Sequence, residues 1–371
     1  MAQPSVFQRY FLPGFVFQSV VIAGGYGTGR ELAEFFLSRG PLGGLFAMAL
    51  AMLIWSAVAA TSFELARMHQ SYDYRSFFQH LLGRGWFIYE ICYFAQLAIV
   101  LAVIAAAAGA ILQETFQFPY ALGVVGMMLA VGILVFQGSA AIERALAGWS
   151  FVLYGVYLVL FAWSFRRFGP EIIANFGAEP LGFDWIRGGV EYAAYNLAII
   201  PAILFTVRHA RKRREALSAG FLAGPIAMFP ALLFYLAMVG QFPQIADEAV
   251  PANYLLGVLG SRAFQLAFQA VLFGTLIETG TGMIHAINER VAARYRERGL
   301  ELPVYARPTI ALTLLIMGAM IATVGLTNLI AKGYGTLTWI FLFVFVIPVL
   351  TRGVALIVRH RASEPRTDGA G

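Results

Sequence analysis

The amino-acid sequence predicts an all-α membrane protein with about ten membrane-spanning helices. Hydrophobic residues make up 60% of the 371 residues and charged residues only 12%, about half the charged share of an average soluble domain. The mean hydropathy is +0.73. It arises from repeated apolar runs of roughly 20 residues, each long enough to cross the hydrocarbon core of a bilayer. No soluble core could hide so much apolar surface, so we expect these runs to lie in a membrane.

Ten apolar runs are expected to be spans, and short polar segments connect them. The predicted spans are residues 10–37, 41–66, 86–112, 119–137, 140–165, 188–207, 215–240, 263–289, 304–325 and 333–352. Between the second and third spans, Phe77, Phe78 and Leu81 recur at helical spacing. This spacing predicts a short helix that lies either in the membrane interface or against other loops.

The basic residues predict the orientation of the spans. With ten spans and an inner N-terminus, 19 of the 26 Lys and Arg residues fall on the cytoplasmic side, six fall on the outer side, and Arg30 lies within the first span. This asymmetry follows the positive-inside rule, so both termini are expected in the cytoplasm. The basic residues behind the net charge of +6 are therefore interpreted as anchors of the loops and not as a nucleic-acid-binding surface. Residues 361–371 are polar and are predicted to form a disordered cytoplasmic tail.

The spans divide into two equal groups around residues 166–187. Five spans precede this segment and five follow it, and an odd number in each half means that the second half crosses the membrane in the opposite sense. Residues 1–360 are therefore expected to form one transmembrane domain. Its two inverted repeats are predicted at about residues 10–165 and 188–352.

The first predicted span contains a glycine-rich interruption. It consists of Gly24, Gly25, Tyr26, Gly27, Thr28 and Gly29, with Arg30 and Glu31 directly after it. Each glycine weakens a helix interior by about 1 kcal/mol, so we expect two half-helices around an unwound segment. Unwound backbone at membrane depth is tolerated where it is buried or lines a cavity, and its amides and carbonyls can bind a solute or an ion. The alternative is that the glycines only allow close helix packing.

The charge of Arg30 lies at a depth where an ionised side chain needs a partner or water. Glu31, Glu34 and Glu278 are candidate partners within the chain, and a substrate carboxylate is another. The sequence leaves two hypotheses open, a structural Arg–Glu pair and a contact with substrate.

The sixth predicted span carries a second interruption, at Pro201. Proline removes a helix hydrogen bond and crowds the preceding turn, so carbonyl groups from Leu197 onward are expected to be free. Asn196 could bind these carbonyls or a ligand. Proline kinks also occur in membrane helices that bind nothing, but paired interruptions in corresponding spans indicate a transport site.

The eighth predicted span carries polar residues at its centre. Thr275, Glu278 and Thr279 share one helical face by their spacing of three and four residues. A charged and unpaired carboxylate at this depth costs several kcal/mol, so Glu278 should pair with a cation, face water or carry a proton. This pattern predicts a role in coupling to protons or sodium, and the alternative is that the threonine hydroxyls bond only their own helix backbone.

No pattern of a metal site, a cofactor site or an enzyme active site is recognisable in the sequence. The five His and the single Cys92 lack the paired spacing of metal ligands. There is no phosphate-binding loop, and residues 25–29 do not fit a dinucleotide fingerprint. No nucleophile and base stand out as a pair. We therefore expect no enzyme activity, no metal and no cofactor, with Na⁺ or H⁺ as a coupling ion.

These features together resemble the LeuT-type fold of the amino acid, polyamine and organocation transporter superfamily. The resemblance covers about residues 10–352 and consists of five plus five spans, an inner N-terminus and interrupted first and sixth spans. Residues 25–29 are similar to the short Gly-Ser/Thr-Gly motif in the first span of amino-acid permeases. More narrowly, the chain looks like the bacterial YkvI-type membrane proteins, which implies a place in the bacterial cytoplasmic (inner) membrane.

The resemblance implies a central solute site between spans one and six and a coupling-ion position between spans one and eight. The solute-binding residues would be Gly24, Gly25, Tyr26, Gly27, Thr28, Gly29, Arg30, Tyr192, Tyr195 and Asn196. The ion-coupling residues would be Ala23, Glu31, Thr275, Glu278 and Thr279.

The sequence is thus expected to encode a secondary active transporter of a small polar or zwitterionic solute such as an amino acid. In such a carrier, helix bundles rock around a site near the membrane midplane and expose it to each side in turn. The solute and the lipid bilayer are the expected partners, and the oligomeric state is not indicated. The alternative is a membrane sensor or an assembly subunit that keeps the transporter fold and moves no solute.

Overall fold

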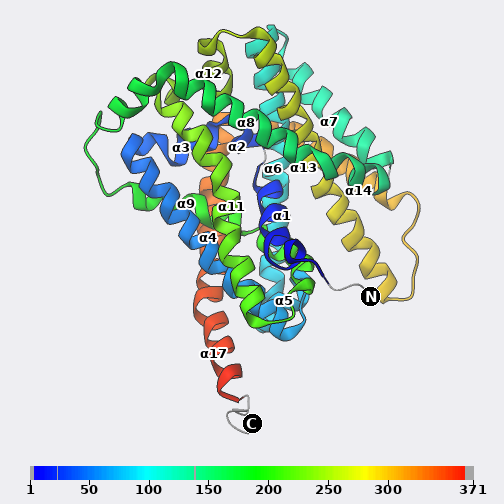
Figure 1. Cartoon of the computed structure of the whole chain (residues 1–371). Coiled ribbons are helices and arrows are strands. Elements are labelled where there is room, and N and C mark those ends of the chain that lie inside the picture. The colour runs from blue at the N-terminus through cyan, green and yellow to red at the C-terminus, as the bar shows by residue number, and fades with distance from the viewer. Residues whose placement is uncertain (1–3, 23, 138, 364–371) are drawn as a thin grey trace.

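The computed structural model describes residues 4–22, 24–137 and 139–363, and these residues form helices joined by short turns (Figure 1). The first half of the chain contains η1 (Phe7–Phe11), α1 (Leu12–Val21), α2 (Gly24–Thr28), α3 (Arg30–Phe35), η2 (Leu37–Arg39), α4 (Pro41–His69), α5 (Tyr74–Leu82), η3 (Gly83–Gly85), α6 (Trp86–Phe116), α7 (Tyr120–Gln137) and α8 (Ser139–Asn175).

The second half begins after a turn and is equally helical. It contains α9 (Trp185–Leu197), α10 (Ile200–Ile203), η4 (Leu204–His209), α11 (Arg213–Val239), η5 (Gln244–Asp247), α12 (Pro251–Leu259), α13 (Arg262–Glu297), α14 (Ala306–Ala322), α15 (Leu326–Asn328), η6 (Leu329–Tyr334), α16 (Gly335–Phe341), η7 (Leu342–Val346), η8 (Val349–Gly353) and α17 (Val354–Ser363).

Five helical stretches of the described chain are long and apolar enough to cross a membrane. They are Pro41–His69, Tyr74–Phe116, Arg213–Val239, Arg262–Ala292 and Leu326–His360. A sixth is the pair of α9 with the segment Ile200–His209, bent by 40° at a short break, and α7 and α14 are shorter apolar helices. The predicted first and fifth spans correspond to α1–α3 and to α8. Each predicted span therefore coincides with helical structure, and the prediction of about ten helices is confirmed.

Two helices reach well past the predicted ends of their spans. α8 continues to Asn175 through a kink at Phe168, next to Pro170, and α13 continues to Glu297. Hydropathy locates only the apolar part of a helix. Both helices continue beyond their apolar part into segments that contain charged residues.

The two halves share one order of elements with opposite orientation. In the first half the short helix α5 follows α4, and in the second half the short helix α12 follows α11. The two short helices lie at opposite ends of the molecule, α5 at the bottom and α12 at the top of Figure 1. This is the relation expected of an inverted repeat. Phe77, Phe78 and Leu81 of α5 are buried, which places α5 against other parts of the protein.

The helices α4 and α11 pack closely against each other. A Cβ atom added to Gly220 of α11 would lie 2.3 Å from the Cα of Ala60 of α4, and one added to Gly224 would lie 2.2 Å from Oγ of Ser56. The hydroxyl of Ser56 donates to the carbonyl of Phe221 at 2.9 Å. Small residues allow membrane helices to approach this closely, so the two glycines allow the close approach of α4 and α11.

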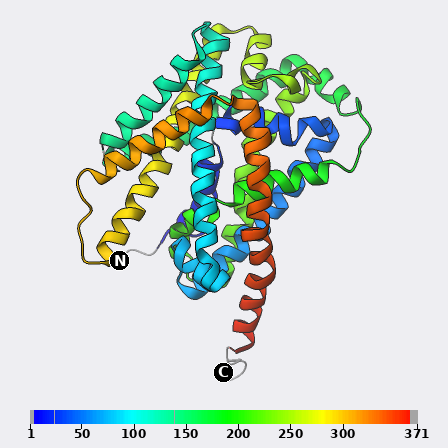
Figure 2. The same ribbon diagram turned by 180° about the vertical axis from the view of Figure 1, so that it is seen from behind.

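The first and last described helices lie toward the same end of the molecule, as both views show (Figures 1 and 2). An even number of spans requires this arrangement. Apolar side chains also remain exposed along outer helices, as with Leu122, Val125, Leu129 and Ile133 of α7. Such a surface is unusual in a soluble monomer and is suited to lipid.

Candidate functional site

The first span is broken in two places, on either side of its glycine-rich stretch. Helix α1 ends at Val21, and the φ and ψ of the next residue, Ile22, are −74° and 84° and are not helical. Gly29 has a φ of +81° and separates α2 from α3, a conformation that glycine adopts without steric cost. The stretch Gly24–Thr28 is itself a short helix rather than the unwound segment expected from its composition. Ala23 lies outside the described residues.

The glycines of α2 lie in close contact with three neighbouring groups. A Cβ atom at Gly24 would lie 3.2 Å from the carbonyl oxygen of Val103 on α6, and one at Gly27 would lie 2.4 Å from Cδ1 of Leu272 on α13. At Gly25 it would lie 2.2 Å from Oε1 of Glu31. The sequence analysis gave two alternatives for these glycines, a break in the helix or close packing against neighbours. In the structure the glycines do both.

The carboxyl group of Glu31 is enclosed at the centre of the bundle. The residue is 1% exposed, and it accepts a hydrogen bond from the hydroxyl of Tyr195 on α9. The ring of Tyr192 lies edge-on to that of Tyr195, with centroids 5.6 Å apart. Among the described residues no basic side chain forms an ion pair with it. Glu31 thus connects α3, which follows Gly29, to α9, which leads into the interruption before Pro201.

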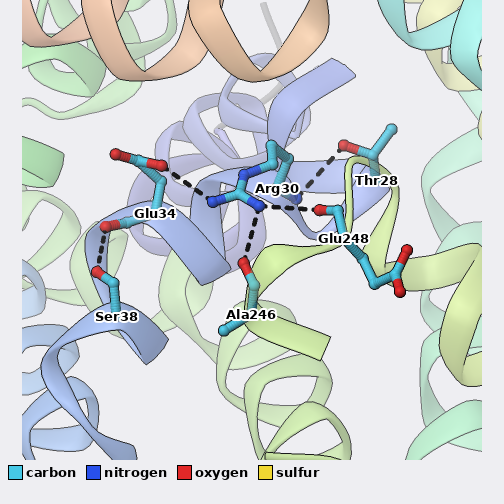
Figure 3. A network of polar contacts seen from close by, with 6 residues as sticks. All are labelled: Thr28, Arg30, Glu34, Ser38, Ala246 and Glu248. Carbon is cyan, nitrogen blue, oxygen red and sulfur yellow. Dashed lines mark hydrogen bonds and ion pairs between the residues drawn. The ribbon is translucent and has the colours of Figure 1, made fainter. Parts of the chain in front are cut away.

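Arg30 holds the outer loop at residues 246–248 in place, and Figure 3 shows its contacts. Its guanidinium donates to Glu34 at 2.9 Å and to the carbonyls of Ala246 and Glu248 at 2.9 and 2.8 Å. The hydroxyl of Thr28 bonds the carbonyl of Gly25 at 3.0 Å. Among the partners that the sequence suggested for Arg30, the structure shows an ion pair with Glu34. The two backbone carbonyls that Arg30 also contacts were not indicated by the sequence.

The second break lies at residues 198–199, between α9 and α10, and Pro201 is in the first turn of α10. The carbonyls exposed there are taken up by side chains of α6. Gln96 donates to the carbonyl of Tyr195 at 3.0 Å, and Tyr89 donates to that of Ala198 at 2.7 Å. Asn196 does not reach these groups, because its amide donates to the carbonyl of Tyr192 one turn earlier, at 3.1 Å.

The polar residues of α13 lie next to Ile22, at the break between α1 and α2. We call this break in the first span the first break. The hydroxyl of Thr279 is 3.0 Å from the carbonyl of Thr275 and 3.5 Å from that of Ile22. The hydroxyl of Thr275 bonds the carbonyl of Val271 at 3.0 Å. Both threonines thus bond their own helix, and Thr279 also reaches the first span. Glu278 is half-buried, and no hydrogen bond or ion pair to it is present among the described residues.

An outer cavity lies between the end of the first span, the start of α9 and the segment from η6 to α16. It has a volume of 580 Å³ and is lined by Glu34, Phe35, Arg39, Arg187, Glu191, Ala331, Lys332, Gly335, Thr336, Trp339 and Ile340. We call it the vestibule. The ring of Tyr195 stacks on Phe35, which lines the vestibule, and on Tyr334, with centroids 5.5 and 4.6 Å apart. We call these three rings the three-ring stack.

Several residues around the site were not predicted from the sequence. Tyr157 of α8 donates to the carbonyl of Gly27 at 3.4 Å, and Tyr334 belongs to the stack. Tyr89 and Gln96 bond the carbonyls of the second break. Gln96 is a polar residue within an otherwise apolar run. This pattern could have identified it from the sequence as a residue of the site.

The arrangement of the helices is the LeuT fold, and solved transporter structures share it. MhsT in complex with L-phenylalanine aligns with a TM-score of 0.61 over 97% of this chain and 99% of its own, at 13% identity. The Eremococcus coleocola manganese transporter, in complex with an aromatic bis-isothiourea substituted compound, gives 0.51 over 97% and 88%, at 15% identity. A Na⁺-coupled sialic acid symporter in a substrate-bound outward-open state gives 0.52 over 92% and 86%, at 12% identity.

A curated protein of similar sequence is the uncharacterized membrane protein YkvI of Bacillus subtilis strain 168. The two chains are 22% identical over 282 residues, which are 75% of this chain and 79% of YkvI. No protein-family model matches the chain. The resemblance to a LeuT-fold membrane protein that the sequence predicted is thus confirmed at the level of the fold.

Proposed function

We propose that the protein is a secondary active transporter of a small polar or zwitterionic solute such as an amino acid. The observation that carries this proposal is the contact between the two broken spans. Tyr195, just before the second break, donates to Glu31, just after Gly29. Broken helices that meet at midprotein are typical of solute sites in such carriers. The shared fold with MhsT and with a sialic acid symporter supports the same class of function.

In the proposed cycle, access alternates between the two ends of the molecule. The stack of Phe35, Tyr195 and Tyr334 would open to admit solute from the vestibule and close behind it. At the other end, Arg9 just before α1 pairs with Glu215 of α11 at 2.8 Å, and this pair would separate to release solute. Solute and ion drive the cycle only as far as they bind the two facing states with different affinity.

For the coupling ion we propose a position between α13 and the first break. The carbonyl of Ile22 and the hydroxyls of Thr275 and Thr279 are oxygen donors of the kind that bind Na⁺, and the carboxylate of Glu278 could take up a proton. Ala23 stays part of this proposal from the resemblance. We also propose, from the distribution of Lys and Arg, that both termini are cytoplasmic and that the membrane is the bacterial inner one.

Uptake into proteoliposomes tests the transport function. Purified protein is first screened with amino acids and related solutes for ligand-dependent thermal stabilisation, and each stabilising solute is then offered as a labelled substrate under imposed proton or sodium gradients. We expect gradient-driven accumulation of at least one of them. Stabilisation without uptake or counterflow, in vesicles that contain correctly oriented protein, would identify a sensor and refute the transporter.

Replacing Glu278 with Gln is expected to reduce the stimulation of uptake by the driving ion about tenfold, because the amide can neither release a proton nor provide a negative charge. Initial uptake rates of the variant and the wild type are compared across pH and sodium concentration. Glu171→Gln, an exposed carboxylate of α8, is the matched control and should behave as the wild type. Unchanged pH and sodium dependence of the Glu278 variant would remove this residue from coupling.

A further inference from the structure

We propose that the connection between the two repeats lies in the lipid–water interface of the outer leaflet and anchors this part of the protein to the bilayer. The connection consists of residues 176–184, between α8 and α9, and we call it the repeat connection. In both views it lies at the edge of the molecule, where the chain leaves the end of α8 and returns to α9 (Figures 1 and 2). It is separate from the solute and ion positions proposed above, so the inference does not depend on the transported solute.

The first observation is a group of large apolar side chains that the protein leaves uncovered. Leu181 and Phe183 of the repeat connection are 48% and 87% exposed, and Ile173 and Ile186 on the adjoining helical turns are 70% and 44% exposed. All four lie outside the apolar runs predicted as spans. Single exposed apolar residues are common on protein surfaces, whereas a group within one short segment indicates contact with lipid or with a partner.

The packing of this segment on α4 is the second observation. A Cβ atom added to Gly43 would lie 3.7 Å from Cβ of Trp185 and 3.9 Å from Cδ1 of Leu181. The ring of Phe46 lies against that of Trp185, with centroids 5.6 Å apart. Gly43 and Phe46 belong to the first two turns of α4. The repeat connection therefore lies at the level of these two turns.

The apolar part of α4 locates the boundary of the membrane. Residues 41–63 contain no charged side chain and span roughly 34 Å as a helix, slightly more than the hydrocarbon core of about 30 Å. The first turns of α4 therefore lie at one boundary of the core, and the repeat connection lies at the same boundary. Both termini are proposed to be cytoplasmic, so this boundary belongs to the outer leaflet.

Two features favour lipid over a partner protein as the occupant of this surface. Phe46, which contacts Trp185, is itself 43% exposed, and Leu53 two turns along α4 is 56% exposed. The apolar surface of the connection is thus continuous with the exposed surface of a helix that is long and apolar enough to cross the membrane. Tryptophan is also enriched at the level where membrane and water meet, and Trp185 occupies this level.

The charged groups of the repeat connection are held by the protein and not by the apolar surface. Asp184 forms an ion pair with Arg39, and the carboxyl group of Glu179 lies against Gly40. Arg39 also lines the vestibule, as does Arg187 in the first turn of α9. A segment with apolar side chains on one side and charges on the other is suited to the interface of a bilayer. The anchored connection would join the membrane surface to one wall of the vestibule.

Fluorescence quenching tests the inference on the full chain in lipid nanodiscs. The single cysteine, Cys92, is replaced with Ser, and Phe183→Cys in this background is labelled with bimane. Nitroxide attached to phospholipid headgroups quenches a label in the interface, and iodide quenches a label in water. We expect severalfold stronger quenching by the nitroxide lipid than at Glu301→Cys, an exposed position in the loop after α13, and weaker quenching by iodide.

Two further labelled positions complete the comparison. Leu129→Cys of α7, 61% exposed, gives the iodide response of a lipid-facing side chain. Leu181→Cys should repeat the result at Phe183 and provides a second site in the connection. Since Phe183 is 87% exposed, its replacement should leave the thermal midpoint at that of the Cys92→Ser parent.

The outcomes that would overturn the inference concern both labels of the connection. Iodide quenching equal to that at Glu301, without quenching by the nitroxide lipid, would place the connection in water. Quenching by neither agent would show that a second copy or another protein covers it. Both results would remove the bilayer as the occupant, and neither would bear on the proposed transport function, because no solute is used.

Discussion

Replacing Arg30 with Met is expected to lower the free energy of unfolding by about 3 kcal/mol, the lower end of the range for breaking a buried ion pair. The side chain of Arg30 is 7% exposed, whereas that of Glu34 is 30% exposed and keeps part of its hydration. The substitution removes the ion pair and also the two bonds to the carbonyls of Ala246 and Glu248. The thermal midpoint of the detergent-purified protein, measured without solute, should fall clearly.

Arg262 is a control, because it is exposed and donates to the neutral side chain of Gln265 at 2.9 Å. Arg262→Met should leave the thermal midpoint close to that of the wild type. Glu34→Gln should cost less than Arg30→Met, since Arg30 then retains both carbonyls. An unchanged midpoint of the Arg30 variant without solute would instead favour the hypothesis that Arg30 exists to contact substrate.

The positions of the spans could be predicted from the sequence because burial in lipid is a local property. A run such as that of α6 is apolar whatever it packs against, and hydropathy alone finds it. The first break could also be predicted, since the helix propensity of glycine and the left-handed conformation of Gly29 are properties of one residue. The sequence located the second break near Pro201, and the structure has it just before this proline.

The partners of the site residues could not be predicted, because they come from distant parts of the chain. Arg30 bonds loop carbonyls more than 200 residues away, and a carbonyl carries no signal in the sequence. The sequence also did not indicate that Tyr157 lies near Gly27. The same limit applies to Asn196, which was expected to meet free carbonyls. The side chains of Tyr89 and Gln96 take these carbonyls, and Asn196 bonds its own helix.

The two breaks differ in how their backbone groups are satisfied, and this difference bears on function. At the second break, side chains of α6 bond the carbonyls of Tyr195 and Ala198. At the first break, the hydroxyl of Thr279 lies 3.5 Å from the carbonyl of Ile22. Backbone N–H and C=O groups in a membrane interior are costly unless they form hydrogen bonds. The long contact at Ile22 is one reason why we propose the coupling position there.

Gly220→Ala is expected to destabilise the protein by about 1–3 kcal/mol, the usual cost of overpacking, and to reduce the yield of folded protein. The added Cβ would lie 2.3 Å from both the nitrogen and the Cα of Ala60 and 2.6 Å from the carbonyl carbon of Ala59. These are backbone atoms, and they cannot move aside as a flexible side chain does. The helices α4 and α11 would have to separate, and the bond from Ser56 to Phe221 would be strained with them. Thermal midpoints of the purified variants measure the effect.

Gly126→Ala in α7 is the matched control, because a Cβ there meets nothing within 4 Å. Alanine favours a helix over glycine by about 1 kcal/mol, so this variant should be as stable as the wild type or slightly more stable. Equal midpoints for the two variants would contradict the close approach of α4 and α11. The contrast matters for transport as well, since α4 belongs to the first repeat and α11 to the second. A wider spacing at Gly220 should therefore also slow uptake, whereas the change at Gly126 should leave uptake unaltered.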